Sequence, residues 1–171
     1  VTSSKVAAAF SNPRQKQPFL DTPSPHRPLR CADLLSKESP GDRRMARLQM
    51  LVGVMTGPTN RDRRDAIRQT WMRWPSVGHS ALVCFAIGRH HVPSDALRRL
   101  DAEQREMGDL MFLPAADGCV KQVSIGKMYA FWIRAWQLVG HLEAPPFLVK
   151  TDDDSALHLP LLEATLKSMH C

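Results

Sequence analysis

Four short apolar runs alternate with amphipathic segments in the last two thirds of this 171-residue chain, and this alternation constrains the fold most strongly. We expect strands at residues 48–55, 81–88, 109–113 and 147–149, and helices at residues 61–74, 95–107, 124–139 and 159–169. Because the strands are apolar throughout rather than at alternate positions, the pattern predicts an α/β fold: a mostly parallel sheet that helices cover on both faces. In such sheets, ligands bind beyond the carboxyl ends of the strands.

Residues 1–47 differ in composition from the rest of the chain. They hold six of the 13 prolines and nine of the 23 Lys and Arg residues, but only four of the 17 Asp and Glu residues. Proline interrupts regular structure, so we expect a basic stem or linker that stays outside the core of a domain at residues 48–171. Its removal should leave the melting temperature nearly unchanged. A nucleic-acid-binding protein usually carries its basic residues on the folded domain, so that role is not favoured.

The four cysteines, Cys31, Cys84, Cys119 and Cys171, allow two disulfides in any of three pairings, or four free thiols. No two of them form a CxxC pair, so we do not expect a structural zinc site. Cys84 lies within an apolar run, and we interpret it as a buried free thiol. No apolar run has the length of about 20 residues that a membrane-spanning helix needs.

Three adjacent aspartates, Asp152, Asp153 and Asp154, directly follow the last apolar run. Neighbouring carboxylates repel one another and raise each other's pKa, and a hard divalent cation relieves this conflict. Along an extended segment Asp152 and Asp154 would share one face, and Asp153 would point to the other. We predict a metal or ligand site here; the alternative is a solvated acidic turn before the next helix.

A second charged cluster, residues 61–68, follows the first strand and opens a helix. Arginine side chains and helix N-termini both bind phosphate, so this cluster and a metal held by the aspartates would form a nucleotide-diphosphate site. Taken alone, the cluster is explained more simply as a solvated helix face with internal ion pairs. The sequence lacks the phosphate-loop, GxGxxG and GxSxG signatures of ATPases, dehydrogenases and α/β-hydrolases.

Two segments resemble the β-1,3-galactosyltransferase family, a group of inverting glycosyltransferases that includes β-1,3-N-acetylglucosaminyltransferases and, more distantly, the fringe enzymes. Residues 63–71 (RRDAIRQTW) resemble its RRxxIRxTW segment, and residues 147–155 (FLVKTDDDS) resemble its (F/Y)xxKTDDD segment. Residues 108–127 are similar to the segment that leads into a lysine of the family. The segments occur in the family's order and spacing.

The resemblance implies a Rossmann-like GT-A fold, of which residues 48–171 would be the nucleotide-sugar-binding half, with the C-terminal part of that fold missing from this sequence. The donor would be a UDP-sugar, with UDP-galactose as first choice, and the cofactor Mn²⁺. The product would be a β-1,3-linked hexose on a glycan or glycoprotein acceptor, formed with inversion. Such enzymes are type II membrane proteins of the Golgi lumen, so only an anchor upstream of this sequence would contact the membrane.

Carried over position by position, the resemblance implies a metal ligand and a set of donor-binding residues. Asp154 would bind the metal. The donor would be bound by Arg63, Arg64, Arg68, Trp71, Lys127, Asp152 and Asp153. The family's next acidic motif and its histidine would lie beyond Cys171, so the catalytic base is unknown and we expect this chain alone not to transfer sugar. The sequence departs from the family at Met72, where Gly is usual, and at Cys119, where Tyr is usual.

Two other classes of function remain open. One is a non-catalytic module, or degraded relative, that binds a nucleotide diphosphate. The other is a metal-dependent phosphotransfer domain of the receiver type. The latter is disfavoured because its acidic residues would be split between different strands.

Overall fold

The computed structural model describes residues 28–36, 44–117 and 124–169 of the chain. Its helices and strands follow in the order α1 (Cys31–Leu35), η1 (Met45–Arg47), β1 (Met50–Met55), α2 (Arg61–Gln69), η2 (Trp71–Arg73), β2 (Ala81–His90), α3 (Ser94–Met107), β3 (Leu110–Ala116), α4 (Ser124–Val139), β4 (Phe147–Asp152) and α5 (Leu159–Ser168), where η denotes a 3-10 helix. All the strands and helices expected within residues 48–169 are therefore present. Among the described residues, no helix has the length and apolarity that crossing a membrane requires.

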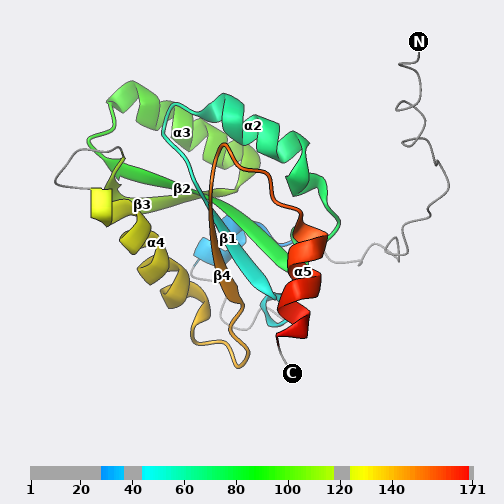
Figure 1. Cartoon of the computed structure of the whole chain (residues 1–171). Helices are drawn as coiled ribbons and strands as arrows, with labels where there is room; N and C mark the ends of the chain where they lie inside the picture. Colours follow the sequence, from blue (N-terminus) through cyan, green and yellow to red (C-terminus); the bar gives the residue numbers. More distant parts are fainter. Residues whose placement is uncertain (1–27, 37–43, 118–123, 170–171) are drawn as a thin grey trace, which may run out of the picture.

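The four strands of the described residues form one parallel sheet in the order β3-β2-β1-β4 (Figure 1). The chain builds outward from β1 to β2 and β3, and then returns through α4 to place β4 on the other side of β1. This reversal creates a switch point between β1 and β4, the place where ligands bind in open parallel sheets. Met55 lies opposite Asp152 in the register, so the segments after β1 and β4 emerge side by side. The predicted α/β fold is confirmed.

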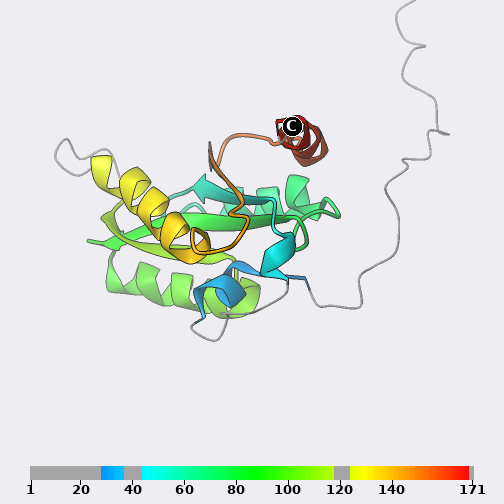
Figure 2. The same ribbon diagram turned by 90° about the horizontal axis from the view of Figure 1, so that it is seen from below.

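Alternate side chains of each strand enter two different cores. Leu51 packs on one face with α1 and α4, while Val52 packs on the other with side chains of α2, α3 and α5. Figure 2 shows α1 and α5 on opposite sides of the sheet. Burial on both faces explains why β1 and most of β2 are apolar at consecutive positions.

Close packing fixes the position of α4 on the sheet. The fully buried ring of Phe131 covers Gly53 in the middle of β1, where an added Cβ would lie 2.2 Å from the ring. The apolar surface of α4 extends beyond this contact, because Tyr129, Ile133 and Trp136 are exposed.

Helix α2 is shorter than the expected residues 61–74. It ends at Gln69, since Thr70 leaves the helical region (φ −113°, ψ −105°), and the chain then makes the separate 3-10 turn η2. Helix α3 ends as expected at Gly108, which adopts the left-handed conformation (φ 70°) that glycine tolerates best. Its N-cap is Pro93 rather than the expected Ser94, which is the first helical residue.

The described part of residues 1–47 packs against the domain, so our expectation that this segment stays outside the core is wrong there. Leu29, Cys31, Leu34 and Met45 are each at most 4% exposed and belong to the same core as α4. A short helical turn near residues 31–37 was compatible with the sequence, but the high proline content of the segment led us to expect no packing against the domain. The expected stem at residues 1–27 lies outside the described residues.

Cys31 of α1 forms a disulfide with Cys84 of β2, with the two Cα atoms 5.5 Å apart. The interpretation of Cys84 as a free thiol is therefore wrong. Burial alone does not separate a thiol from a disulfide, and the partner lies in the segment that we had expected outside the core. Cys119 and Cys171 lie outside the described residues.

Replacing both Cys31 and Cys84 with alanine should lower the free energy of unfolding by about 2–5 kcal/mol, because the disulfide restricts the unfolded chain across a 53-residue separation. Urea unfolding followed by circular dichroism measures this loss. A reducing agent should destabilise the natural chain to the same extent and leave the double variant unchanged. Equal stability of the oxidised natural chain and the double variant would show that the disulfide contributes nothing.

Candidate functional site

The three aspartates form a turn at the end of β4, which we call the aspartate turn (Asp152–Asp154). Asp152 is the last residue of β4, and the amide of Asp153 donates to the carbonyl oxygen of Met55 at the end of β1 (3.2 Å). The amide of Ser155 donates to the carbonyl oxygen of Asp152 (3.2 Å). The aspartate turn is thus attached to the switch point of the sheet.

The carboxylate of Asp153 is enclosed by side chains from the segment after β1 and from the first turn of α2. One oxygen accepts hydrogen bonds from Thr56 Oγ1 (2.7 Å) and Asn60 Nδ2 (2.8 Å). The other oxygen accepts from the Arg63 guanidinium (2.8 Å). Only 8% of the Asp153 side chain is exposed, compared with 56% of the Arg63 side chain.

These contacts set the protonation of Asp153. Burial by itself would raise the pKa of the Asp153 carboxyl, but the hydrogen bonds from Asn60, Thr56 and Arg63 outweigh it and lower the pKa below its ordinary value. The same hydrogen bond to Asp153 raises the pKa of Arg63. The pair is therefore ionised at neutral pH.

The other two aspartates of the turn are exposed. Asp152 is 54% exposed and accepts a hydrogen bond from Lys150 Nζ (2.7 Å). Asp154 is exposed, and its carboxylate makes no hydrogen bond or ion pair with the residues that the structure describes. Two carboxylates of the turn are therefore accessible to a ligand.

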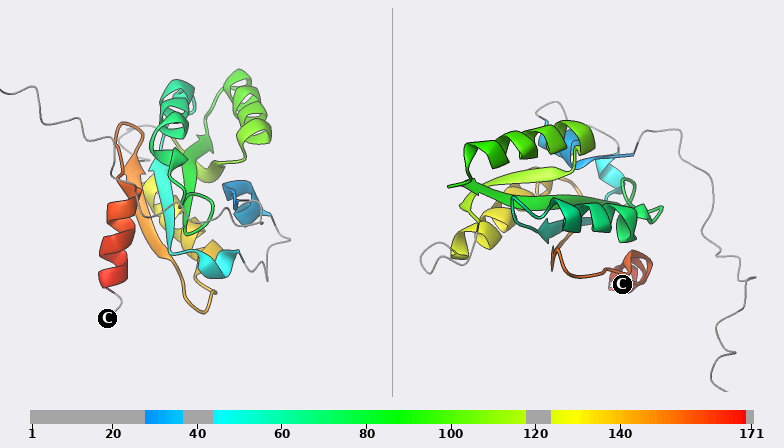
Figure 3. Two further views of the ribbon diagram at one scale, coloured as in Figure 1. Left: turned by 90° about the vertical axis from the view of Figure 1, so that its right-hand side faces the viewer. Right: turned by 90° about the horizontal axis from the view of Figure 1, so that it is seen from above.

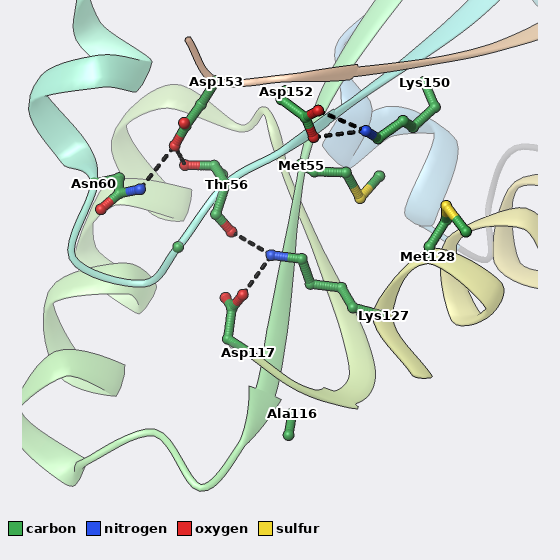
Figure 4. A pocket seen from close by; sticks show the side chains of 11 residues that line it. Met55, Thr56, Asn60, Ala116, Asp117, Lys127, Met128, Lys150, Asp152 and Asp153 are labelled. Carbon is green, nitrogen blue, oxygen red and sulfur yellow. Dashed lines mark hydrogen bonds and ion pairs between the residues drawn. The ribbon is translucent and has the colours of Figure 1, made fainter. Parts of the chain in front are cut away.

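A pocket of about 360 Å³, pocket A, lies beside the turn at the carboxyl ends of the strands. Its lining comprises Met55, Thr56, Gly57, Asn60, Ala116, Asp117, Lys127, Met128, Lys150, Asp152 and Asp153 (Figure 4). Lys127 reaches in from α4, where it donates to the carbonyl oxygen of Thr56 (2.8 Å) and forms an ion pair with Asp117. The structure thus brings Lys127, Asp152 and Asp153 together.

A second pocket of about 430 Å³, pocket B, lies on the other side of Asp153, between α2 and the segment that follows the aspartate turn. It brings together three of the expected site residues, Arg63, Trp71 and Asp154, with Asp153. Trp71 is only 6% exposed, and much of its ring packs in the core.

Arg64 and Arg68 do not face either pocket, which contradicts their expected contact with a donor. Arg64 is fully buried, and its guanidinium makes two hydrogen bonds to Glu103 of α3 (2.8 and 2.6 Å) and one to the carbonyl oxygen of Gly57 (2.7 Å). Arg68 is 11% exposed and binds Asp109 through two hydrogen bonds (2.8 and 2.7 Å) and Glu103 through one (2.7 Å).

Arg64 and Arg68 point away from the pockets because α2 packs along α3. Figure 3 shows these two helices side by side. Glu103 on α3 is buried, and burial alone would raise the pKa of its carboxyl, but Arg64 and Arg68 lower the pKa below its ordinary value. The two arginines neutralise an acidic side chain inside the protein, and their guanidinium groups are directed at protein partners rather than at either pocket.

Among the described residues, no group of three or more His, Cys, Asp and Glu side chains could hold a metal ion. The aspartate turn does not form such a cage, because Asp153 is enclosed while Asp152 and Asp154 point outward. A small divalent cation is commonly held by one or two carboxylates, with water and substrate phosphates completing its coordination. Asp152, which lines pocket A, and Asp154, which lines pocket B, are both exposed, and each is available as one such carboxylate.

The expected site omitted Thr56, Asn60, Asp117 and Lys150. Thr56 and Asn60 flank a Gly-Pro pair directly after the first apolar run, so their position at the carboxyl end of a strand was the available signal.

Comparison with known proteins gives one family. The family model described as "Galactosyltransferase" matches residues 62–170, which include all of α2 except its first residue, pocket B and the aspartate turn. Probable beta-1,3-galactosyltransferase 3 of Arabidopsis thaliana is 30% identical over 144 residues, covering 78% of this chain and 32% of the relative. Probable beta-1,3-galactosyltransferase 4 of the same plant is 32% identical over 125 residues, covering 68% and 29%.

A mouse protein is similar to the same extent. Beta-1,3-galactosyltransferase 6 of Mus musculus is 29% identical over 125 residues, covering 72% of this chain and 37% of the relative. The chain therefore spans about a third of the length of these curated relatives.

Proposed function

Because this chain belongs to the galactosyltransferase family, we propose that its aspartate turn and pocket A form the donor site of a β-1,3-galactosyltransferase-like enzyme. The donor is a UDP-sugar, with UDP-galactose as first choice, and the acceptor is a glycan or glycoprotein. The reaction transfers the hexose in β-1,3 linkage with inversion. Acceptor binding and the removal of the acceptor proton are assigned to the whole protein, since this chain spans only a part of its relatives.

One observation supports this proposal most strongly: at the switch point of a parallel sheet, the accessible carboxylate of Asp152 lies beside two lysines in pocket A, and that of Asp154 lies in pocket B on the other side of Asp153. Asp152 and Asp154 would hold Mn²⁺, which would act as a Lewis acid on the diphosphate. Lys127 and Lys150 line pocket A, and their ammonium groups suit the negative charge of the diphosphate. Arg63, at pocket B, is exposed enough to contribute to the same field.

The family's Golgi location belongs to this proposal as well. The disulfide between Cys31 and Cys84 supports it, because disulfides persist in oxidising compartments such as those of the secretory pathway. The proposal therefore includes the luminal side of the Golgi membrane as the location of this domain.

Calorimetric titration with UDP tests the donor site. We expect the 171-residue chain to bind UDP in the presence of Mn²⁺, at least about tenfold more weakly without it, and to bind ADP more weakly than UDP. A non-catalytic module would give the same binding, so sugar transfer from UDP-galactose must also be measured on the full-length protein. Binding of UDP that is indifferent to Mn²⁺, or no preference for UDP over ADP, would contradict the proposal.

A further inference from the structure

We propose that Thr56, Asn60 and Arg63 are positioning residues, which hold Asp153 so that Asp152 and Asp154 project from the aspartate turn toward the ligand. In this assignment Asp153 does not contact the donor. We call the contact of these three side chains with Asp153 the clamp. What the turn binds rests on the function proposed above, whereas the clamp is a property of the folded chain.

The hydrogen bonds of Asp153 leave little capacity for a ligand. Its two oxygens accept from three side chains at 2.7 to 2.8 Å, and the side chain is 8% exposed. Figure 4 shows its carboxylate directed to Thr56 and Asn60, away from the Asp152–Lys150 pair. Three of its roughly four acceptor sites are therefore occupied by side chains of the protein.

The clamp lies at the end of an edge strand, where the turn has few neighbours. β4 is the edge strand among the described strands, so the turn at its end has the β1 side of the sheet as its only strand neighbour. All three donors to Asp153 come from that side, from the residue after β1 to the first turn of α2. The backbone of the turn is joined to β1 from the same side, because the amide of Asp153 donates to the carbonyl oxygen of Met55.

The clamp is itself held in place by buried side chains. Arg64 donates to the carbonyl oxygen of Gly57 (2.7 Å) and lies within 3.4 Å of Thr56 Oγ1, while Glu103 fixes its guanidinium from the opposite side. The two adjacent arginines therefore have different roles. Arg63 contacts the aspartate turn, and Arg64 contacts the segment after β1 that carries the clamp residues.

The first experiment measures amide hydrogen exchange by NMR on the chain without any ligand. In Arg63→Gln and Asn60→Ala, exchange at the amides of Asp153 and Ser155 should become about tenfold faster, while exchange at Phe85 in β2 stays unchanged. Arg63→Lys should restore much of the protection, because the ammonium can still donate to Asp153.

Arg61→Gln is the matched control. Arg61 lies on the same helix and is 42% exposed, but it pairs with Asp65 and Glu106 rather than with the turn. Exchange at Asp153 should stay as in the natural chain. Unchanged protection in both Arg63→Gln and Asn60→Ala would overturn the proposal.

The second experiment is a double-mutant cycle on the affinity for UDP with Mn²⁺. Arg63→Gln and Asp153→Asn should each weaken binding by about tenfold, and the double variant should lose hardly more than either, since both changes break one contact. Additive losses, with Asp153→Asn weakening binding more than about a hundredfold by itself, would make Asp153 a direct ligand and overturn its positioning role.

The two experiments separate the two claims. If the natural chain does not bind UDP with Mn²⁺, the proposed function fails, and the exchange measurement still decides whether the clamp holds the turn.

Discussion

Glu103→Gln should lower the free energy of unfolding by about 3–5 kcal/mol, the largest loss of stability that we expect from a single change of charge in this chain. Glutamine keeps the size of the side chain, so no cavity forms. The change leaves the fully buried guanidinium of Arg64 without a carboxylate, and a buried charge without its partner is strongly destabilising. Arg68 keeps its two hydrogen bonds to Asp109, so the loss falls mainly on Arg64.

Glu106→Gln is the matched control for this prediction. Glu106 lies on the same helix, is 56% exposed and pairs with Arg61 at the surface, where an ion pair contributes less than about 1 kcal/mol. Urea unfolding of the two variants beside the natural chain gives both values. If Glu103→Gln and Glu106→Gln differ by less than about 1 kcal/mol, the buried ion pairs do not stabilise α2 on α3.

The topology was predictable because strands that are buried on both faces have consecutive apolar residues in the sequence. Leu51 and Val52 are neighbours that enter opposite cores, and both positions must be apolar. The carboxyl end of such a strand is then a natural place for polar side chains with a function, which is how the aspartate turn was found.

The roles of the arginines could not be predicted in the same way. Whether Arg64 faces solvent or protein depends on Glu103, which is 39 residues away in the sequence and adjacent only after α2 and α3 pack. A resemblance to the RRxxIRxTW segment specifies the residue types, but not the direction in which each side chain points. Arg63 and Arg64 are adjacent, yet one is 56% exposed and the other fully buried.

The N-terminal segment was misjudged for a related reason. Its average composition is that of a linker, but Cys31 and Leu34 are nearly inaccessible to solvent. Composition is a property of the whole segment, while packing is decided by a few side chains. Cys31 and Cys84 are 53 residues apart in the sequence, and no local pattern predicts that they pair.

Asp154→Ala should abolish Mn²⁺-dependent binding of UDP, the largest effect on binding that we expect from one substitution. Asp154 is the only carboxylate of the aspartate turn without a hydrogen bond or ion pair among the described residues, so it can bind a cation without first losing a partner. Asp152 would have to release Lys150, and Asp153 is held by its three donors. The fold should be unaffected, because the Asp154 side chain is exposed and holds no other residue.

Asp62→Ala provides the control for this change of charge. Asp62 is an exposed aspartate in the first turn of α2, and the segment from Thr56 to Arg63 brings that turn close to Asp153. Its removal changes the net charge near the site by the same amount but takes away no carboxylate of the aspartate turn. UDP binding should remain close to that of the natural chain.

Isothermal titration of UDP into the natural chain, Asp154→Ala and Asp62→Ala, each with and without Mn²⁺, tests the central claim most directly. We predict Mn²⁺-dependent binding by the natural chain and by Asp62→Ala, and none by Asp154→Ala. Binding of UDP with Mn²⁺ to Asp154→Ala at the natural affinity would contradict the assignment of the aspartate turn as the metal and donor site.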